Sequence, residues 1–149
     1  MARRELGPAA LAVAQAVERM VRGVDRFVVG CSGGPDSLAL ALASKWASRR
    51  CESGVRVVIV DNKLQQGSVD VAERSRDLLV IRGIGGCVRR VAVDADDPDG
   101  PEAAARTARR AALLDVAGDE PVLLGHTRDD QAEQVWLSLA RGGAATARA

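Results

Sequence analysis

One stretch, Arg26 to Ser37 (RFVVGCSGGPDS), constrains the fold of this chain more than any other. Phe27 to Cys31 is a short apolar run typical of a buried strand, and an Ala/Leu-rich helical stretch starts a few residues later. The whole connection is Ser32-Gly33-Gly34, after which Pro35 suits the first turn of a helix. Such a turn leaves backbone N–H groups free at the positive end of the helix dipole. The stretch therefore predicts an anion-binding turn.

The spacing of this turn excludes two common phosphate-binding loops. Neither the Walker pattern G-x-x-x-x-G-K-[ST] nor the dinucleotide pattern G-x-G-x-x-G is present. The segment SGGPDS instead resembles the pyrophosphate loop of the N-type ATP pyrophosphatases, which split ATP into AMP and pyrophosphate. A plain strand-to-helix turn capped by Ser32 is the alternative. The resemblance implies that the pyrophosphate is held by Ser32, Gly33, Gly34, Pro35, Asp36 and Ser37.

Apolar runs alternate with amphipathic helical stretches along the chain. The pattern predicts a leading helix that ends near Gly23, strands at Val55–Asp61, Val88–Asp94 and Pro121–Gly125, and helices that begin at Ser68, Pro101 and Asp129. This alternation indicates an α/β fold: a doubly wound, mostly parallel sheet of the Rossmann-like, adenine nucleotide alpha hydrolase-like kind. The Val88–Asp94 run is interrupted by two arginines, so we expect it at a sheet edge.

Polar residues follow each predicted strand, where a doubly wound sheet binds its ligand. They are the turn already described, Asp61-Asn62, Asp94 to Asp97, and Gly125 to Asp130. An acid at a strand end can also simply cap a turn. Two carboxylates opposite a pyrophosphate loop favour Mg²⁺ between them, because this cation takes oxygen ligands and neutralises phosphate charge. His126, the only histidine, is expected either to hydrogen-bond within its loop or to contact substrate.

Composition narrows the choice of function only slightly. The 149 residues carry 21 basic and 20 acidic side chains, so the net charge of +1 gives no argument for binding nucleic acid or a membrane surface. The three cysteines form no C-x-x-C pair for zinc, iron–sulfur or redox chemistry, and buried thiols in a reducing cytoplasm are the simpler interpretation. No apolar run approaches the length of a membrane span, so we expect no membrane partner.

Further segments make the resemblance more specific. GHTRDDQAEQVWLSLARGG, VVIVDN and GPEAAARTAR, together with SGGPDS, resemble the N-terminal catalytic domain of the tRNA(Ile)-lysidine synthetase family, from about Phe27 to Gly143. The resemblance implies a ligase that uses ATP and Mg²⁺ and forms a carbon–nitrogen bond. ATP would activate carbon-2 of the wobble cytidine in a tRNA(Ile) with a CAU anticodon as an adenylate. Free L-lysine would then displace AMP to give lysidine.

The same resemblance assigns roles to single residues. Asp36 and Asp130 would be the metal-linked catalytic acids, Asp61 would lie near the adenosine, and His126 would contact the nucleotide. Arg106 would stabilise the charge that moves to the leaving pyrophosphate, and Arg109 matches a second arginine of the family pattern. A solvated helix face is the alternative for Arg106.

Three hypotheses remain open at this point. The first is lysidine synthesis by a single pyrophosphatase domain over residues 1–149, which we expect to be incomplete at its C-terminus. The second is another adenylating enzyme, a tRNA thiolase or an amide-forming synthetase, which the missing C-x-x-C disfavours. The third is a truncated, non-catalytic nucleotide-binding remnant, which Asn62, Lys63 and Gln65 favour because they depart from the family pattern. The oligomeric state is left undetermined.

Overall fold

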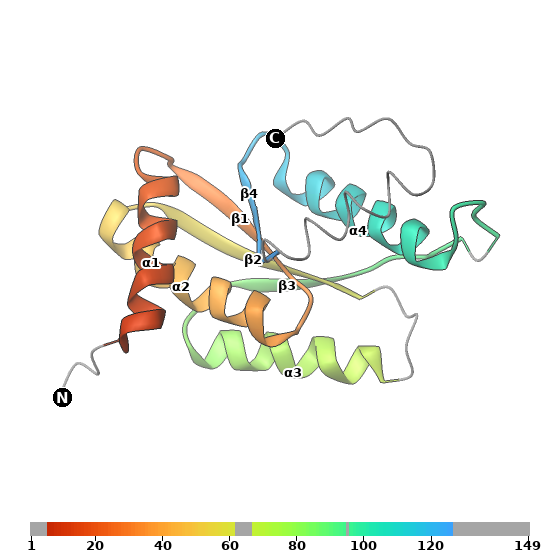
Figure 1. The fold of residues 1–149 in the computed structure, drawn as a ribbon, viewed down its shortest axis with the longest axis horizontal. Coiled ribbons are helices and arrows are strands. Elements are labelled where there is room, and N and C mark those ends of the chain that lie inside the picture. The colour runs from red at the N-terminus through yellow and green to blue at the C-terminus, as the bar shows by residue number, and fades with distance from the viewer. Residues whose placement is uncertain (1–5, 62–66, 95, 127–149) are drawn as a thin grey trace.

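The computed structural model describes residues 6–61, 67–94 and 96–126. Helices and strands alternate along this part of the chain (Figure 1). In order they are α1 (Pro8–Val21), β1 (Arg26–Cys31), α2 (Pro35–Cys51), β2 (Gly54–Asp61), α3 (Ser68–Ile81), β3 (Gly86–Arg90), α4 (Pro101–Ala117) and β4 (Val122–Leu124). No described helix is both long and apolar enough to cross a bilayer.

The four described strands form one parallel sheet in the order β3-β2-β1-β4. The chain moves outward from β1 through β2 to β3, then returns through α4 to place β4 on the other side of β1. The direction of winding therefore reverses between β1 and β4, which is where such sheets bind ligands beyond the carboxyl ends of their strands. The prediction of a doubly wound parallel sheet is confirmed.

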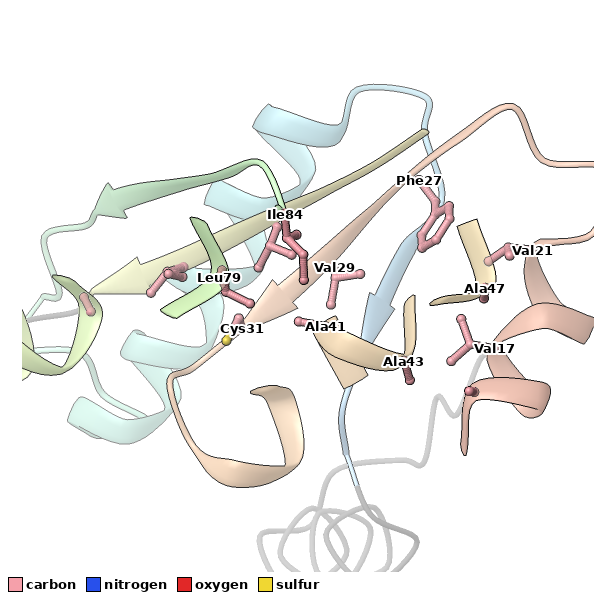
Figure 2. Packing of buried hydrophobic residues seen from close by; sticks show 14 residues of the cluster. Val17, Val21, Phe27, Val29, Cys31, Ala41, Ala43, Ala47, Leu79 and Ile84 are labelled. Carbon is pink, nitrogen blue, oxygen red and sulfur yellow. The ribbon is translucent and has the colours of Figure 1, made fainter. Parts of the chain in front are cut away.

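Helices cover both faces of the sheet, and each face has its own core. On one face, α1, α2 and α3 pack against alternate strand residues such as Phe27, Val29 and Ile59 (Figures 1 and 2). On the other face, Leu113 and Ala117 of α4 pack against Val28, Val58 and Val60. Strands buried on both faces need continuous apolar runs, which explains the sequences FVVGC and VVIV.

Small side chains allow α2 to lie close to its neighbours. The buried positions of α2 are all alanine or serine: Ser37, Ala41, Ala43, Ser44, Ala47 and Ser48. Val17 and Val21 of α1 are also buried and belong to the same cluster (Figure 2). Because α2 follows directly from the turn after β1, this packing fixes the direction in which the start of α2 points.

The third strand differs from its predicted range. Val88–Asp94 was expected, but β3 runs from Gly86 to Arg90. The last register pair joins Arg90 to Asp61, where β2 ends, and the Asp61 carbonyl oxygen accepts a further bond from the Val91 N–H at 2.9 Å. The expected edge position is confirmed, since β3 lies at one end of the described sheet.

The helix that Ser68 begins is buried along a narrow stripe. Its Val71 and Leu78 are 47% and 38% exposed. Only the stripe of Ala72, Ser75 and Leu79 is buried, because α3 covers the outer part of the sheet and contacts it along one narrow face. The predicted helix from Asp129 lies outside the described residues.

Candidate functional site

The turn between β1 and α2 is built on two glycines with different conformations. Gly33 has φ of +87°, which L side chains rarely adopt, and a Cβ atom there would lie 2.9 Å from both Ser75 Oγ and Val71 Cγ1. Gly34 has φ of −73° and is the residue before the first turn of α2. The turn therefore lies directly against α3, and only glycine fits at its middle position.

Ser37 holds the turn together from inside. Its side chain is buried, and its hydroxyl donates a hydrogen bond to the Gly34 carbonyl oxygen at 3.0 Å. Ser37 Oγ also accepts a bond from the Ser32 N–H at 3.2 Å and lies 3.3 Å from Ser32 Oγ. Cys31 Sγ is 3.4 Å from Ser37 Oγ. The Ser37 hydroxyl thus closes the turn across five residues of separation.

The first turn of α2 presents donors for an anion. Within the described part of the chain, the N–H groups of Gly33, Asp36 and Ser37 donate to no other residue. These groups are the ones that a helix N-terminus leaves unpaired, and they lie at the positive end of the helix dipole. Asp36, exposed in the same turn, adds a carboxylate. The arrangement can hold phosphate oxygens together with a cation.

The end of β4 lies against the same turn. A Cβ atom at Gly125 would be 3.3 Å from Ser37 Cα and 3.4 Å from the Asp36 carbonyl oxygen, so backbone meets backbone here. His126 follows and is exposed. Segments that are about ninety residues apart in the printed sequence thus lie side by side at the switch point. The sequence predicted that both segments lie at one rim, but it gave no signal for this contact.

Asp61 lies at the same rim as the turn. It ends β2, the strand next to β1, and is only 3% exposed. The last pair of the β1–β2 register is Cys31 with Ile59, so Asp61 extends two residues past the end of β1, at the level of the turn that follows. The sheet therefore brings Ser32 and Asp61 to one edge.

Two arginines of α4 approach the site from the other face. Arg109 lies one helical turn from Leu113, which packs against β1 at Gly30, and its Nε is buried with no hydrogen-bond partner among the described residues. Arg106, almost one turn nearer the start of α4, is exposed. The helix runs antiparallel to the strands, so both side chains lie toward the carboxyl ends. Sequence reasoning gave a role to Arg106 alone; the signal for Arg109 is its four-residue spacing from Ala105 and Leu113, both buried.

The acids after β3 have a simpler role. Asp94 Oδ1 accepts a bond from the Asp96 N–H at 3.0 Å, and Asp97 Oδ1 accepts one from the Asp99 N–H at 2.8 Å. Each is a local turn in which the side chain caps nearby backbone. These carboxylates begin four residues after the end of β3 at Arg90, and their contribution to the binding rim stays a prediction.

Comparison with known proteins decides the family. A family model described as a PP-loop domain matches residues 9–148. The chain belongs to the PP-loop family.

Relatives of this PP-loop chain share one name. It is 90% identical over 149 residues to the tRNA(Ile)-lysidine synthase of Cutibacterium acnes, which is all of this chain and 48% of that protein. It is 49% identical over 145 residues to the tRNA(Ile)-lysidine synthase of Thermobifida fusca, covering 93% of this chain and 44% of that one. The chain thus spans about half the length of these curated relatives.

A solved structure supports the fold of the PP-loop domain. The U34-tRNA thiolase NcsA from Methanococcus maripaludis superposes with a TM-score of 0.66, covering 90% of this chain and 51% of that chain. The identity is 18%, so the likeness shows the fold alone. The family resemblance carried by SGGPDS is confirmed by the family match.

Most predicted site residues of the PP-loop domain gather at one rim. The turn from Ser32 to Ser37, Asp61 and His126 lie at the carboxyl ends of neighbouring parallel strands. Asp130 lies outside the described residues. Within the described part of the chain no three histidine, cysteine or acidic side chains form a group that could hold a metal ion.

Proposed function

We propose that this chain is the nucleotide-binding part of an enzyme that uses ATP to ligate L-lysine to carbon-2 of the wobble cytidine of tRNA(Ile), giving lysidine, AMP and pyrophosphate. The observation that carries the proposal is a PP-loop at the switch point of the sheet, in a chain 90% identical to a tRNA(Ile)-lysidine synthase. A cytoplasmic location fits this role, because tRNA and ATP are found there.

The turn after β1 binds the β- and γ-phosphates of ATP in this proposal. The N–H groups of Gly33, Asp36 and Ser37 supply the hydrogen bonds, and the α2 dipole favours the negative charge. Gly33 lets the backbone follow α3 closely, while Ser37 fixes the shape of the turn from within. Pro35 is the first residue of α2, where its missing N–H group costs no hydrogen bond within the helix.

Mg²⁺ fits the donor set at this turn. Asp36 offers exposed carboxylate oxygens beside the phosphate-binding amides, and Mg²⁺ is usually bound by one or two carboxylates together with substrate phosphates. Asp36 would hold the ion, with Asp130 as its proposed second ligand. Bound there, it would neutralise phosphate charge.

The proposed reaction has two chemical steps. In the first, the oxygen on carbon-2 of the cytidine attacks the α-phosphorus of ATP, and pyrophosphate leaves with the electron pair of the broken bond. In the second, the ε-amine of lysine attacks carbon-2, loses a proton, and AMP leaves with the oxygen. Arg106 and Arg109 stabilise the negative charge on the departing phosphates, since both lie toward the rim of the sheet.

Asp61 and His126 contact the rest of the nucleotide in this proposal. Asp61 is buried one strand away from the turn and lies near the adenosine, where a carboxylate can accept hydrogen bonds from hydroxyl or amino groups. His126 follows Gly125, whose backbone touches Asp36 and Ser37. In this proposal its imidazole contacts the nucleotide.

The thiolase alternative has no support from the cysteines. Cys31 is buried in β1, Cys51 ends α2, and Cys87 lies in β3, all as free thiols on separate elements. Cys31 is also the only one beside the turn, where its sulfur packs against Ser37. A non-catalytic remnant remains the competing hypothesis, and it predicts nucleotide binding without transfer.

The test follows both products of the reaction. The chain would be joined to the C-terminal half of the Cutibacterium acnes relative and incubated with ATP, Mg²⁺, labelled lysine and a tRNA(Ile) transcript. We expect AMP and labelled tRNA in equal amounts, and neither with a transcript that carries uridine at the wobble position. Lysine transfer that does not require ATP, or none while ATP is bound, would refute the proposal.

A further inference from the structure

A shallow groove runs between α3 and the outer strand β3. It encloses about 520 Å³ and is lined by Glu73 and Arg76 of α3 and by the whole of β3, Gly86–Arg90. Three arginines and one glutamate line it, which gives the lining a net charge of +2. This is a local excess of positive charge on a chain whose net charge is only +1.

One end of the groove, at Arg90, lies beside the rim that carries the PP-loop. Arg90 is the register partner of Asp61, and Asp61 lies one strand away from the turn after β1. Two strand spacings of about 4.8 Å put the end of β3 about 10 Å from the PP-loop strand. A polymer bound in the groove is therefore close enough to reach the nucleotide site.

The arginines of the groove are only loosely held. Arg76 pairs with Glu73 at 2.8 Å and with Asp77 at 3.0 Å, and Arg90 reaches Glu73 at 3.7 Å. All of these side chains are more than a third exposed, so each pair contributes little and can exchange for another anion. Arg89 precedes Arg90 in β3, so its side chain leaves the strand on the opposite face, the one on which Cys87 packs, and it lines the groove at the edge of the sheet. The hydrogen bond to Asp77 and the charge of Glu73 raise the pKa of Arg76, so it stays a cation.

We propose that this α3–β3 groove binds the phosphate backbone of the RNA substrate beside the adenylation site. The inference rests on the proposed function and names the surface that holds its tRNA. An open, shallow, cationic groove suits a phosphodiester chain, whose charges need contact but no enclosing pocket. An added protein strand fits less well, because two adjacent arginines on an edge strand are a way in which proteins block strand pairing.

Two single substitutions with opposite expected effects on RNA affinity test the proposal. A fluorescent tRNA(Ile) transcript would be titrated with the 149-residue chain at several salt concentrations, and affinity followed by anisotropy. We expect Arg89→Gln to lower the affinity about two- to fivefold at low salt and the salt slope by about 1. Glu73→Gln should raise the affinity by a similar factor, because it releases Arg76 and Arg90 to phosphate.

Arg49→Gln is the matched control. Arg49 is also exposed, but it lies in the last turn of α2, at the opposite ends of the strands, so RNA affinity should not change. Wild-type affinity and slope in both Arg89→Gln and Glu73→Gln would overturn the groove assignment. So would a change in self-association instead of RNA affinity, measured by sedimentation, because that result assigns the edge to a protein partner.

ATP–Mg²⁺ binding by the same variants separates the two proposals. We expect it to be unchanged in Arg89→Gln and Glu73→Gln, since neither residue touches the turn after β1. If the wild-type chain binds RNA as described but no ATP, the proposed function fails and the groove stands. If it binds ATP but shows no salt-dependent RNA affinity, the groove assignment fails and the proposed function stands.

Discussion

Replacing Gly33 by alanine tests how tightly α3 supports the PP-loop. The backbone at φ of +87° would hold a side chain in a left-handed conformation, which costs roughly 1–2 kcal/mol. The new Cβ would also lie 2.9 Å from Ser75 Oγ and Val71 Cγ1, and such overpacking costs about 1–3 kcal/mol. The change should therefore destabilise the domain by about 2 kcal/mol or more. In a domain of this size that lowers Tm by about 4–8 °C.

The assay is thermal unfolding combined with calorimetric titration of ATP–Mg²⁺. Because the clash moves the turn, we expect weaker ATP binding at a temperature where Gly33→Ala is still folded. Gly34→Ala is the control for stability: its φ is −73°, and the nearest atom to its Cβ, Ser32 Oγ, is 3.6 Å away. Its stability should stay within about 0.5 kcal/mol of wild type. If Gly33→Ala matches wild type in both Tm and ATP affinity, the description of the turn is wrong.

Further predictions concern the turn, the opposite rim and the RNA substrate. Ser37→Ala should cost about 1–3 kcal/mol in thermal unfolding and weaken ATP binding, because the Ser32 N–H and Gly34 carbonyl lose their shared partner; unchanged values would contradict its role. Glu120→Gln weakens contacts to Arg56 at 3.1 Å and Arg26 at 3.5 Å, far from the turn. It should lower Tm by about 2–4 °C without changing ATP affinity, and a loss of ATP binding would count against the assigned location of the site. The 149-residue chain alone should transfer lysine to tRNA(Ile) at least about a hundredfold more slowly than the same chain joined to the C-terminal half of its Cutibacterium acnes relative; equal rates would disprove this.

The sequence predicted the fold because the buried strands and the helices beside them have clear hydrophobic patterns. The run FVVGC followed by SGGPDS indicates a strand, a turn and a helix before any tertiary contact is considered, and β1 and α2 have those positions. Continuous apolar runs predicted parallel strands buried on both faces, which β2 confirms. The position of the site followed from topology, since parallel strands bring their carboxyl ends to one edge.

What sequence reasoning missed depends on contacts between distant segments. The apolar alternation of Val91 and Val93 runs past Arg90 in the sequence, whereas β3 ends at Arg90, opposite its register partner Asp61 at the end of β2. Serine is a residue type that often binds phosphate through its hydroxyl, but the hydroxyl of Ser37 points inward and closes the loop. The contact of Gly125 with the start of α2 needs the order of the strands, which no single segment encodes.

The most direct test of the account is calorimetric titration of ATP with Mg²⁺ into the wild-type chain and Asp36→Asn. Asp36 is exposed in the first turn of α2, so its replacement should leave Tm unchanged. The account predicts that wild type binds ATP in a Mg²⁺-dependent way and that Asp36→Asn loses about tenfold or more of that affinity. Equal binding of ATP–Mg²⁺ by the two proteins would contradict the claim that this turn is the pyrophosphate-binding site.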